Sequence, residues 1–467
     1  MKRSTADAGT GPALWGGAGA DPAMLAYTIG DDRELDARLL PWDIIGSLGH
    51  LEGLLRSGLV SRSQHSRLRA GLRAALRAAD DGKLTIGEDD EDVHSAVEKW
   101  LGRRTGAAGG RIHTGRSRND QIACDLRLFQ KHRLLEIHSA AGSLAGALLE
   151  FAGRHRRTLW PGYTHTRGAM PSTAGLWAGA HAEGLLDTLE SLPALWAQVD
   201  RSPLGSAAGY GVPLPLDREA VQRALGFGGL DHNVAAVQNG RGKLEAGVLF
   251  WCVQLSHDMA RLASDGIMYS ADEYGLLILP PAYTTGSSIM PQKRNPDVFE
   301  ITRARAAGLA GDLVTVLSLR GNLTSGYHRD FQLLKGPLFR GLDHTLEMTT
   351  MLGTVVPALE VNREAARERL SASGILVTDE VMRRVSAGES FREVYHEVAG
   401  EFHGGKPVPP PRESEILGRR LSTGAPGNPD LQHARRRLRA TRTWRDRESR
   451  RFMSAVRRLA GRGGFPA

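Results

Sequence analysis

The chain has 467 residues, a length that predicts roughly two or three domains instead of one compact core. Hydrophobic residues make up 41% and charged residues 24%, which excludes a chain that is disordered throughout. The net charge of +8 raises nucleic-acid binding as a possibility, but no zinc-ligand or aromatic recognition motif accompanies the basic residues. We therefore expect no nucleic-acid partner.

We expect neither a targeting segment nor a membrane span in this sequence. The first 25 residues contain no apolar run of signal-peptide length, and nowhere do 18 apolar residues follow one another. We expect a cytoplasmic protein with no membrane partner. The two cysteines, Cys124 and Cys252, fall in apolar helical patterns, so we predict that both are buried packing residues.

Helical periodicity dominates the middle of the chain. Apolar residues recur at spacings of three and four, which predicts long helices within 122–151, 185–199, 244–262 and 309–316. Strand signals are sparse, because the apolar segment 276–279 stops at two prolines. The pattern predicts an all-α fold of long helices packed as a bundle. We place the domains at 1–112 (N-terminal helical), 113–363 (central bundle) and 364–467 (small C-terminal helical).

Three polar, glycine-containing segments interrupt the helices, at 113–120, 162–171 and 284–296. Polar loops on a rigid helical scaffold are where binding and catalytic residues concentrate. A polar loop alone is weak evidence, since most such loops are only turns. The residues that each loop contains decide its interpretation.

The residues of the loop at 284–296 predict an anion-binding site with a serine hydroxyl group inside it. Asn295, Pro296 and Asp297 form a helix-start pattern, with Asn295 as the predicted N-cap. The start of a helix offers free N–H groups and the positive end of its dipole. Lys293 adds a full positive charge, and Ser287 supplies the hydroxyl group.

The other two loops are less specific. Segment 113–121 carries Arg116 and Arg118 among hydroxyl and amide residues, which suits recognition of a carboxylate by the guanidinium fork. A capped helix start with surface arginines explains the same residues. The loop at 162–171 contains His165, and a lone histidine is more often structural than catalytic. We expect Pro171 to restart a helix after it.

Near the C-terminus, the stretch 435–462 is rich in arginine. A solvated helix face is the simplest interpretation. A positive field that attracts an anionic substrate is an alternative, and the sequence does not decide between them.

Taken together, the three loops resemble the fumarase/aspartase superfamily and, within it, the argininosuccinate lyase family. The run from Gly286 to Pro296 is similar to the superfamily's signature loop, and the run from His113 to Gln121 is similar to its first conserved region. Further matches lie at Leu14–Gly17, Glu91–Ala96, Tyr327–Lys335, Thr378–Asp379 and Phe391–Glu393, so the resemblance spans roughly residues 14–400.

The resemblance implies a three-domain helical subunit, a homotetramer with a twenty-helix core, and active sites that are each built from three subunits. It implies β-elimination of argininosuccinate, a small anionic substrate, to arginine and fumarate, without a cofactor. The implied catalytic residues are Ser287 as base, Lys293 and Asn295 as stabilisers of the dianionic intermediate, and His165 with Glu300 at the leaving nitrogen. The implied substrate-binding residues are Thr28, Ser117, Arg118, Asn119, Thr164, Tyr327, Gln332 and Lys335.

The chemistry of the residues agrees with this implication. Removing a proton beside an ionised carboxylate concentrates negative charge there, so preorganised donors are needed. A serine hydroxyl acts as a base only where its surroundings favour the alkoxide. The histidines show no spacing typical of metal ligands, so no metal is expected.

Departures from the family pattern lie in the segment after His165 and in the segment around Tyr327. They are Thr166, Arg167, Gly168 and Met170 in one loop, and His328, Leu333 and Leu334 in another. Neutral drift at positions that do not contact the substrate would explain these departures. A changed pocket for the leaving amine would explain them equally. Two alternatives therefore stay open: the same elimination, or its reverse, on another N-substituted aspartate, and a catalytically silent structural homologue. The sequence leaves the amine product, the physiological direction and regulation undecided.

Overall fold

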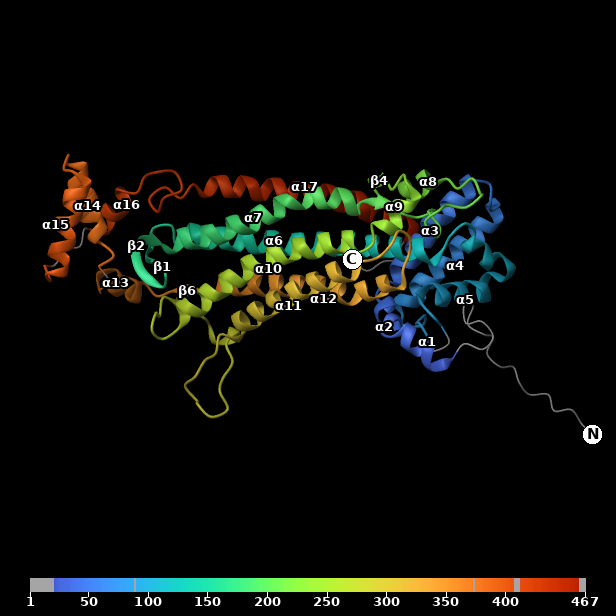
Figure 1. Cartoon of the computed structure of the whole chain (residues 1–467), viewed down its shortest axis with the longest axis horizontal. Helices are drawn as coiled ribbons and strands as arrows, with labels where there is room; N and C mark the ends of the chain where they lie inside the picture. Colours follow the sequence, from blue (N-terminus) through green and yellow to red (C-terminus); the bar gives the residue numbers. More distant parts are fainter. Residues whose placement is uncertain (1–20, 88–89, 373, 407–411, 462–467) are drawn as a thin grey trace, which may run out of the picture.

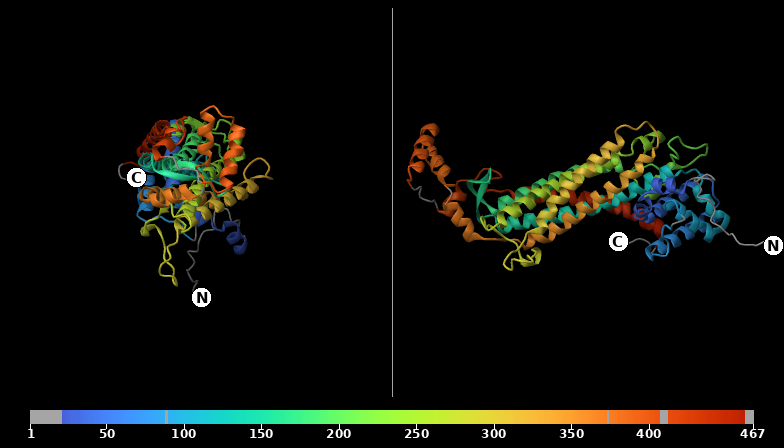
Figure 2. Two further views of the ribbon diagram at one scale, coloured as in Figure 1. Left: turned by 90° about the vertical axis from the view of Figure 1, so that its left-hand side faces the viewer. Right: turned by 60° about the horizontal axis from the view of Figure 1, so that its bottom comes forward.

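The computed structural model describes residues 21–87, 90–372, 374–406 and 412–461. The motif at Leu14–Gly17 lies outside the described residues. Long helices run the length of the molecule, with α1 to α5 gathered at one end and α13 to α16 at the other (Figures 1 and 2). The prediction of an all-α fold is confirmed, since the strands of the described chain are short or belong to small two-stranded pairs.

The central bundle confirms the helices predicted from the apolar stripes. The two stripes between 122 and 151 belong to one continuous helix of 37 residues. Ser117 begins it through a capping box, in which its hydroxyl and the Asp120 carboxylate each accept a backbone N–H. The bundle helices are α6 (Arg118–Arg154), α7 (Ala174–Val199), α10 (Lys243–Ser270), α11 (Asp297–Arg320) and α12 (Lys335–Ala358).

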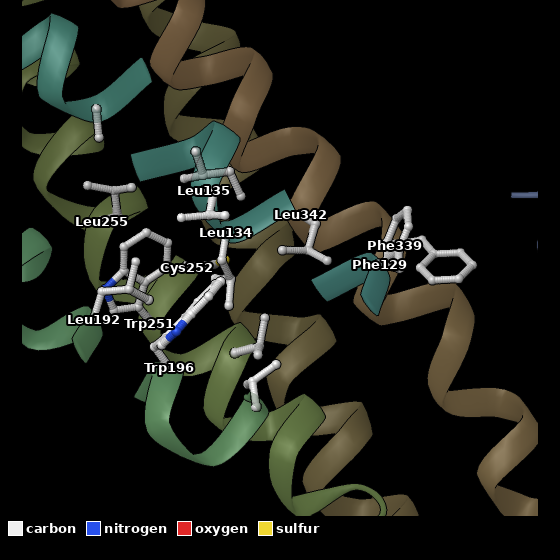
Figure 3. Close-up of a cluster of buried hydrophobic side chains, with 14 of the residues drawn as sticks. Phe129, Leu134, Leu135, Leu192, Trp196, Trp251, Cys252, Leu255, Phe339 and Leu342 are labelled. Atoms are coloured by element: carbon white, nitrogen blue, oxygen red, sulfur yellow. The ribbon is translucent and has the colours of Figure 1, made fainter. Parts of the chain in front are cut away.

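Aromatic and leucine side chains from several helices cluster in the core of this bundle (Figure 3). The rings of Phe129 on α6 and Phe339 on α12 pack with their centroids 4.7 Å apart. Trp251 on α10 donates its indole N–H to the Thr188 carbonyl of α7 at 2.9 Å, so the polar atom of this buried ring is satisfied. Burial of each such side chain stabilises the fold by about 1.5–3 kcal/mol. The predicted burial of Cys124 and Cys252 is confirmed, at 1% and 0% exposure.

Shorter elements cover the end of the bundle where α6 begins. The small strands β3 and β4 pair in parallel beside them. These elements are α1 (Pro22–Ile29), α2 (Asp32–Ala37), α3 (Leu40–Arg56), α4 (Arg62–Asp80), α5 (Val93–Thr105), the 3-10 helix η1 (Gly106–His113), β3 (Arg201–Ser202), α8 (Arg218–Leu225), β4 (Gly229–Leu230) and α9 (Val234–Asn239). The 3-10 helices η2 (Pro281–Tyr283) and η3 (Arg329–Leu334) precede α11 and α12, respectively.

The segment expected to form a small C-terminal domain divides between two places. Four short helices lie beyond the far end of the bundle, and α17 then returns along α6 and α7 (Figure 1). The arginine-rich stretch forms most of this returning helix. No helix in the described ranges is long and apolar enough to cross a membrane. The elements are β5 (Leu277–Ile278), β6 (Glu360–Val361), α13 (Arg363–Ala372), α14 (Val377–Ser386), α15 (Phe391–His403), α16 (Glu413–Gly418) and α17 (Leu431–Ala460).

Buried charge joins α17 to the bundle. The Lys131 ammonium on α6 is fully buried, 2.6 Å from an Asp200 carboxylate oxygen and 4.3 Å from the centre of the Phe452 ring on α17. Burial lowers the pKa of Lys131 to about 8, although Asp200 opposes the change. One buried cation is thus shared by a carboxylate and an aromatic ring of the returning helix.

Two local expectations were wrong. Residues 162–171 do not form a plain loop but lie in an antiparallel hairpin of β1 (Leu159–Thr164) and β2 (Arg167–Thr173). The next helix begins at Ala174, with the Thr173 hydroxyl accepting the Leu176 N–H, and not at Pro171. Pro171 sits in a strand because this two-stranded pair has free edges, where its missing N–H costs no ladder bond.

Candidate functional site

A cavity of about 400 Å³ opens where α2, α5, the start of α6 and η3 meet. Six of the eight predicted substrate-binding residues line this cavity, although they come from two segments that are far apart in the sequence. Charged groups of both signs line it. The predicted residues in its wall are Ser117, Arg118, Asn119, Tyr327, Gln332 and Lys335.

Arg118 is held in place by acids of the α5 segment. Its guanidinium forms ion pairs with Asp92 and with Glu91, the second at 3.2 Å, and donates to the Ser95 hydroxyl at 2.9 Å. Asp92 also accepts the Ser95 N–H, which caps the start of α5. Arg118 is therefore preorganised at the cavity wall, as recognition of a carboxylate requires.

Lys335 sits between two carboxylates. Its ammonium lies 2.5 Å from an oxygen of Asp32 and 2.5 Å from one of Asp36, and its side chain is 3% exposed. Burial raises the pKa of Asp32 to about 6, against the opposing charge of Lys335. Asp32 thus changes charge close to neutral pH, and it faces the cavity.

Two of the predicted binding residues hold the cavity wall together. Gln332 donates its amide N–H groups to the backbone carbonyls of Thr28 and Ile29, each at 2.9 Å. Thr28 does not line the cavity; its hydroxyl donates back to Met24 and Leu25 within α1. Burial raises the pKa of the Tyr327 hydroxyl, which keeps this group neutral as a hydrogen-bond donor.

Sequence reasoning assigned no role to His94 and Arg241, which the structure places in the cavity wall. The His94 ring is 3% exposed, with Nδ1 2.7 Å from an Asp43 oxygen and 3.9 Å from an Asp125 oxygen. These three side chains are close enough to hold a cation. Here the imidazolium itself balances the carboxylates. The signal in the sequence that points to His94 is the Glu91–Ala96 motif.

The His94 cluster predicts a pH-dependent stability. Burial alone would lower the pKa of His94, but Asp43, Asp92 and Asp125 raise it from 6.5 to about 10. The folded protein therefore keeps a proton that the unfolded chain releases near pH 6.5, so the stabilisation is complete below that pH and is lost as the pH rises through 10. The difference in Tm between the unmodified chain and His94→Gln should shrink between pH 6.5 and pH 10. A constant difference across this range would contradict the prediction.

The signature loop lies before α11 and is largely exposed. The Ser287 hydroxyl oxygen accepts the backbone N–H of Ile289 at 3.3 Å and that of Met290 at 3.1 Å. The prediction that Asn295 caps the helix was wrong. Its backbone pairs with Thr285 in an isolated bridge, so α11 begins at Asp297 with Pro296 in the cap position. Lys293 and Glu300 are exposed.

His165 and Thr166 form the tip of the hairpin, and both have a left-handed backbone, with φ of 54° and 59°. Thr164 and Arg167 pair across this two-residue turn, and positive φ at both central positions is typical of a type I′ turn. His165 therefore lies in the turn of the hairpin. Thr164 and His165 are exposed in the single chain.

The strained turn carries a testable consequence. A β-branched residue in the left-handed region is unfavourable by about 1–2 kcal/mol. We expect Thr166→Gly to raise the free energy of unfolding by about 1 kcal/mol, measured by denaturant titration. Thr164→Gly is the control, because Thr164 has an extended backbone and should lose stability on the same change. Equal effects of the two substitutions would refute the explanation.

A single chain keeps the three predicted loops apart. Helix α11, of 24 residues and about 36 Å, separates the Ser287 loop from Tyr327. Helix α6, of 37 residues and about 55 Å, separates Ser117 from the hairpin. The hairpin and the Ser287 loop lie toward the end that bears α13, whereas α2 and α5, which contribute residues to the cavity wall, lie at the opposite end (Figures 1 and 2). None of the proton-transfer residues lines the cavity in its own chain.

The departures from the family pattern take different positions. His328 does not line the cavity, because its Nε2 lies 3.0 Å from the Thr324 carbonyl and shapes the loop before η3. Leu334 is fully buried in the core, while Leu333 is 63% exposed. Arg167 lies on the exposed hairpin beside Thr164.

Comparisons with known proteins agree on one group of enzymes. A family model described as lyase matches residues 29–311. The argininosuccinate lyase of Sorangium cellulosum is 43% identical over 91% of this chain and 98% of its own length, and that of Parabacteroides distasonis is 41% identical over 82% and 86%. An EDDS lyase variant with bound fumarate superposes with a TM-score of 0.79 at 25% identity, over 95% of both chains. A class II fumarase from Schistosoma mansoni shares the fold, with a TM-score of 0.68 at 16% identity, over 80% of this chain and 91% of its own.

Proposed function

The chain belongs to the argininosuccinate lyase family, and from this we propose that it cleaves argininosuccinate to arginine and fumarate by β-elimination. It is a carbon–nitrogen lyase. The observation that carries the substrate assignment is the mixed charge of the cavity wall. Argininosuccinate combines carboxylates with a cationic guanidinium, so its pocket needs groups of both signs.

The cavity contains groups of both charges, although Leu333 and Leu334 stand where the family pattern has an acidic pair after Gln332. Arg118 and Arg241 bring guanidinium groups to the cavity wall, and Asp32, Glu91 and Asp92 bring carboxylates. In the single chain Glu91 and Asp92 pair with Arg118, and Asp32 pairs with Lys335. The acids come from α2 and from the start of α5, far away in the sequence from η3. Carboxylates therefore remain in the cavity wall although positions 333 and 334 are leucines, and a substrate guanidinium would share them with Arg118 and Lys335.

We propose Ser287 as the base that removes the proton beside the carboxylate. The two N–H groups that point at its oxygen, from Ile289 and Met290, stabilise an alkoxide in the same way that donors stabilise an oxyanion. Lys293 and Asn295 then stabilise the dianionic carbon acid. His165, assisted by Glu300, transfers a proton to the leaving nitrogen, and Thr164 contacts a substrate carboxylate.

The helix lengths lead us to propose that other copies of the chain complete the site. The cavity of one copy needs the Ser287 loop and the hairpin of its neighbours, because neither loop can reach the cavity within its own chain. Apolar side chains exposed on the bundle support such an assembly, since a second copy would bury them. They are Phe250, Ile301, Val314, Leu317 and Met351, which are 47–61% exposed. We propose a homotetramer with shared active sites.

The test is an ultraviolet assay of fumarate release with argininosuccinate as substrate, together with quantification of arginine. We expect equal amounts of the two products. Release of fumarate from another N-substituted aspartate, with none from argininosuccinate, would replace the substrate assignment. No turnover of any such substrate by the correctly assembled protein would indicate a silent homologue. Mass measurement of the native protein tests the tetramer independently.

A further inference from the structure

A second cavity, of about 330 Å³, lies on the other side of Arg241 from the substrate cavity. Its wall is formed by α9, the end of α11 and the loop at 321–326. Arg241 and Phe331 line both cavities, whereas Arg320, Gln238 and Thr324 line only the second. A cavity of this size suits a small molecule.

Two buried side chains at this cavity have unused hydrogen-bonding atoms. Arg241 is 5% exposed; its Nε donates to Glu245 at 3.1 Å, but its Nη1 has no partner among the described residues. Gln238 is fully buried and donates to the Asn119 carbonyl at 3.1 Å, while its Oε1 is unpartnered in the described chain. An unpaired group on a buried cation is costly, and a ligand that accepts its N–H removes that cost.

Arg320 is the other charged residue in the described wall of this cavity. Arg320 forms no ion pair within the described ranges, and its side chain lies over Gly242, where an added Cβ would come 3.0 Å from the Arg320 Cβ. Thr324 and Ser325 supply hydroxyl groups. Asn239 accepts the Gly326 N–H at 3.0 Å, which holds the loop against α9. No carboxylate lines this cavity within the described part of the chain.

We propose that this cavity is a second binding site, for a small anion with a phosphate or carboxylate group. Arg320 and the free Nη1 of Arg241 bind the anion, and the hydroxyl groups of Thr324 and Ser325 donate to its remaining oxygens. A protonated oxygen of the ligand can in turn donate to Gln238. Because Arg241 serves both cavities, an anion here takes up positive charge that the substrate cavity also uses.

The experiment is calorimetric titration of the assembled full-length protein at low ionic strength, with inorganic phosphate in one arm and succinate in the other. We expect at least one of these anions to bind. Arg320→Gln should weaken that binding by about tenfold or more, because it removes a charge-assisted contact. Arg118→Gln, which alters only the substrate cavity, and Arg436→Gln, on the distant exposed face of α17, should leave it nearly unchanged.

The outcome separates this site from the substrate cavity without any measurement of turnover. Binding of phosphate alone identifies a phosphate site, and binding of succinate identifies a carboxylate site. The proposal is overturned if neither anion binds, if Arg320→Gln binds as tightly as the unmodified protein, or if Arg118→Gln weakens binding as much as Arg320→Gln. The Tm of each variant without ligand shows that its fold is intact.

Discussion

Ser287→Ala should lower kcat for argininosuccinate cleavage by about 10²–10⁴, because it removes the proposed base. The fold should be unaffected, since Ser287 lies in an exposed loop and its hydroxyl oxygen accepts hydrogen bonds only from two nearby backbone N–H groups. Fumarate release, followed by ultraviolet absorbance at saturating substrate, measures the effect. The Tm and the native mass of the variant should equal those of the unmodified protein.

Ser288→Ala is the matched control, because Ser288 is the neighbouring serine in the same loop and has no assigned role. We expect it to retain most of the activity. A Ser287→Ala enzyme with near-normal kcat would exclude this residue as the base. Equal losses in the two variants would point to disruption of the loop instead of loss of a proton acceptor.

Mixing two inactive variants should restore activity if neighbouring chains share each site. Ser287→Ala removes the base at one end of the bundle, and Arg118→Gln removes a carboxylate contact at the other. In randomly mixed assemblies, about a quarter of the sites receive both intact elements when each site draws them from different copies. We expect each variant alone to be nearly inactive, and the two chains refolded or expressed together to recover about a quarter of the full activity.

A mixture of Ser287→Ala with Lys293→Met is the control for this experiment. Both changes fall in the same loop of one chain, so no site can receive an intact loop and no recovery is expected. Recovery in neither mixture would contradict sharing of the site between Ser287 and Arg118 of different copies. Equal recovery of activity in both mixtures would show that the recovery does not come from sharing of sites between chains.

Features that depend on near neighbours in the chain were predictable. The apolar spacing of α7 and α10 indicated their existence, because one face of a helix recurs every three or four residues. The N-terminal cap of α6 was predictable, since the side chains of Ser117 and Asp120 each accept the backbone N–H of the other residue within one turn. The mistaken cap at Asn295 and the missed hairpin show the limit: pairing of Asn295 with Thr285, ten residues away, overrode the local helix-start pattern.

The sequence alone determined the helical class, the family and the chemical groups of the site, because these depend on side-chain type and on spacing within a few residues. Only the tertiary structure decided which groups meet. Lys335 contacts Asp36, which is 299 residues away in the sequence, and Arg241 lines two cavities. Such contacts follow from how long helices pack across the whole bundle. Helix α11, about 36 Å long, also separates the Ser287 loop from Tyr327, and no local pattern encodes where the ends of this helix lie in the bundle.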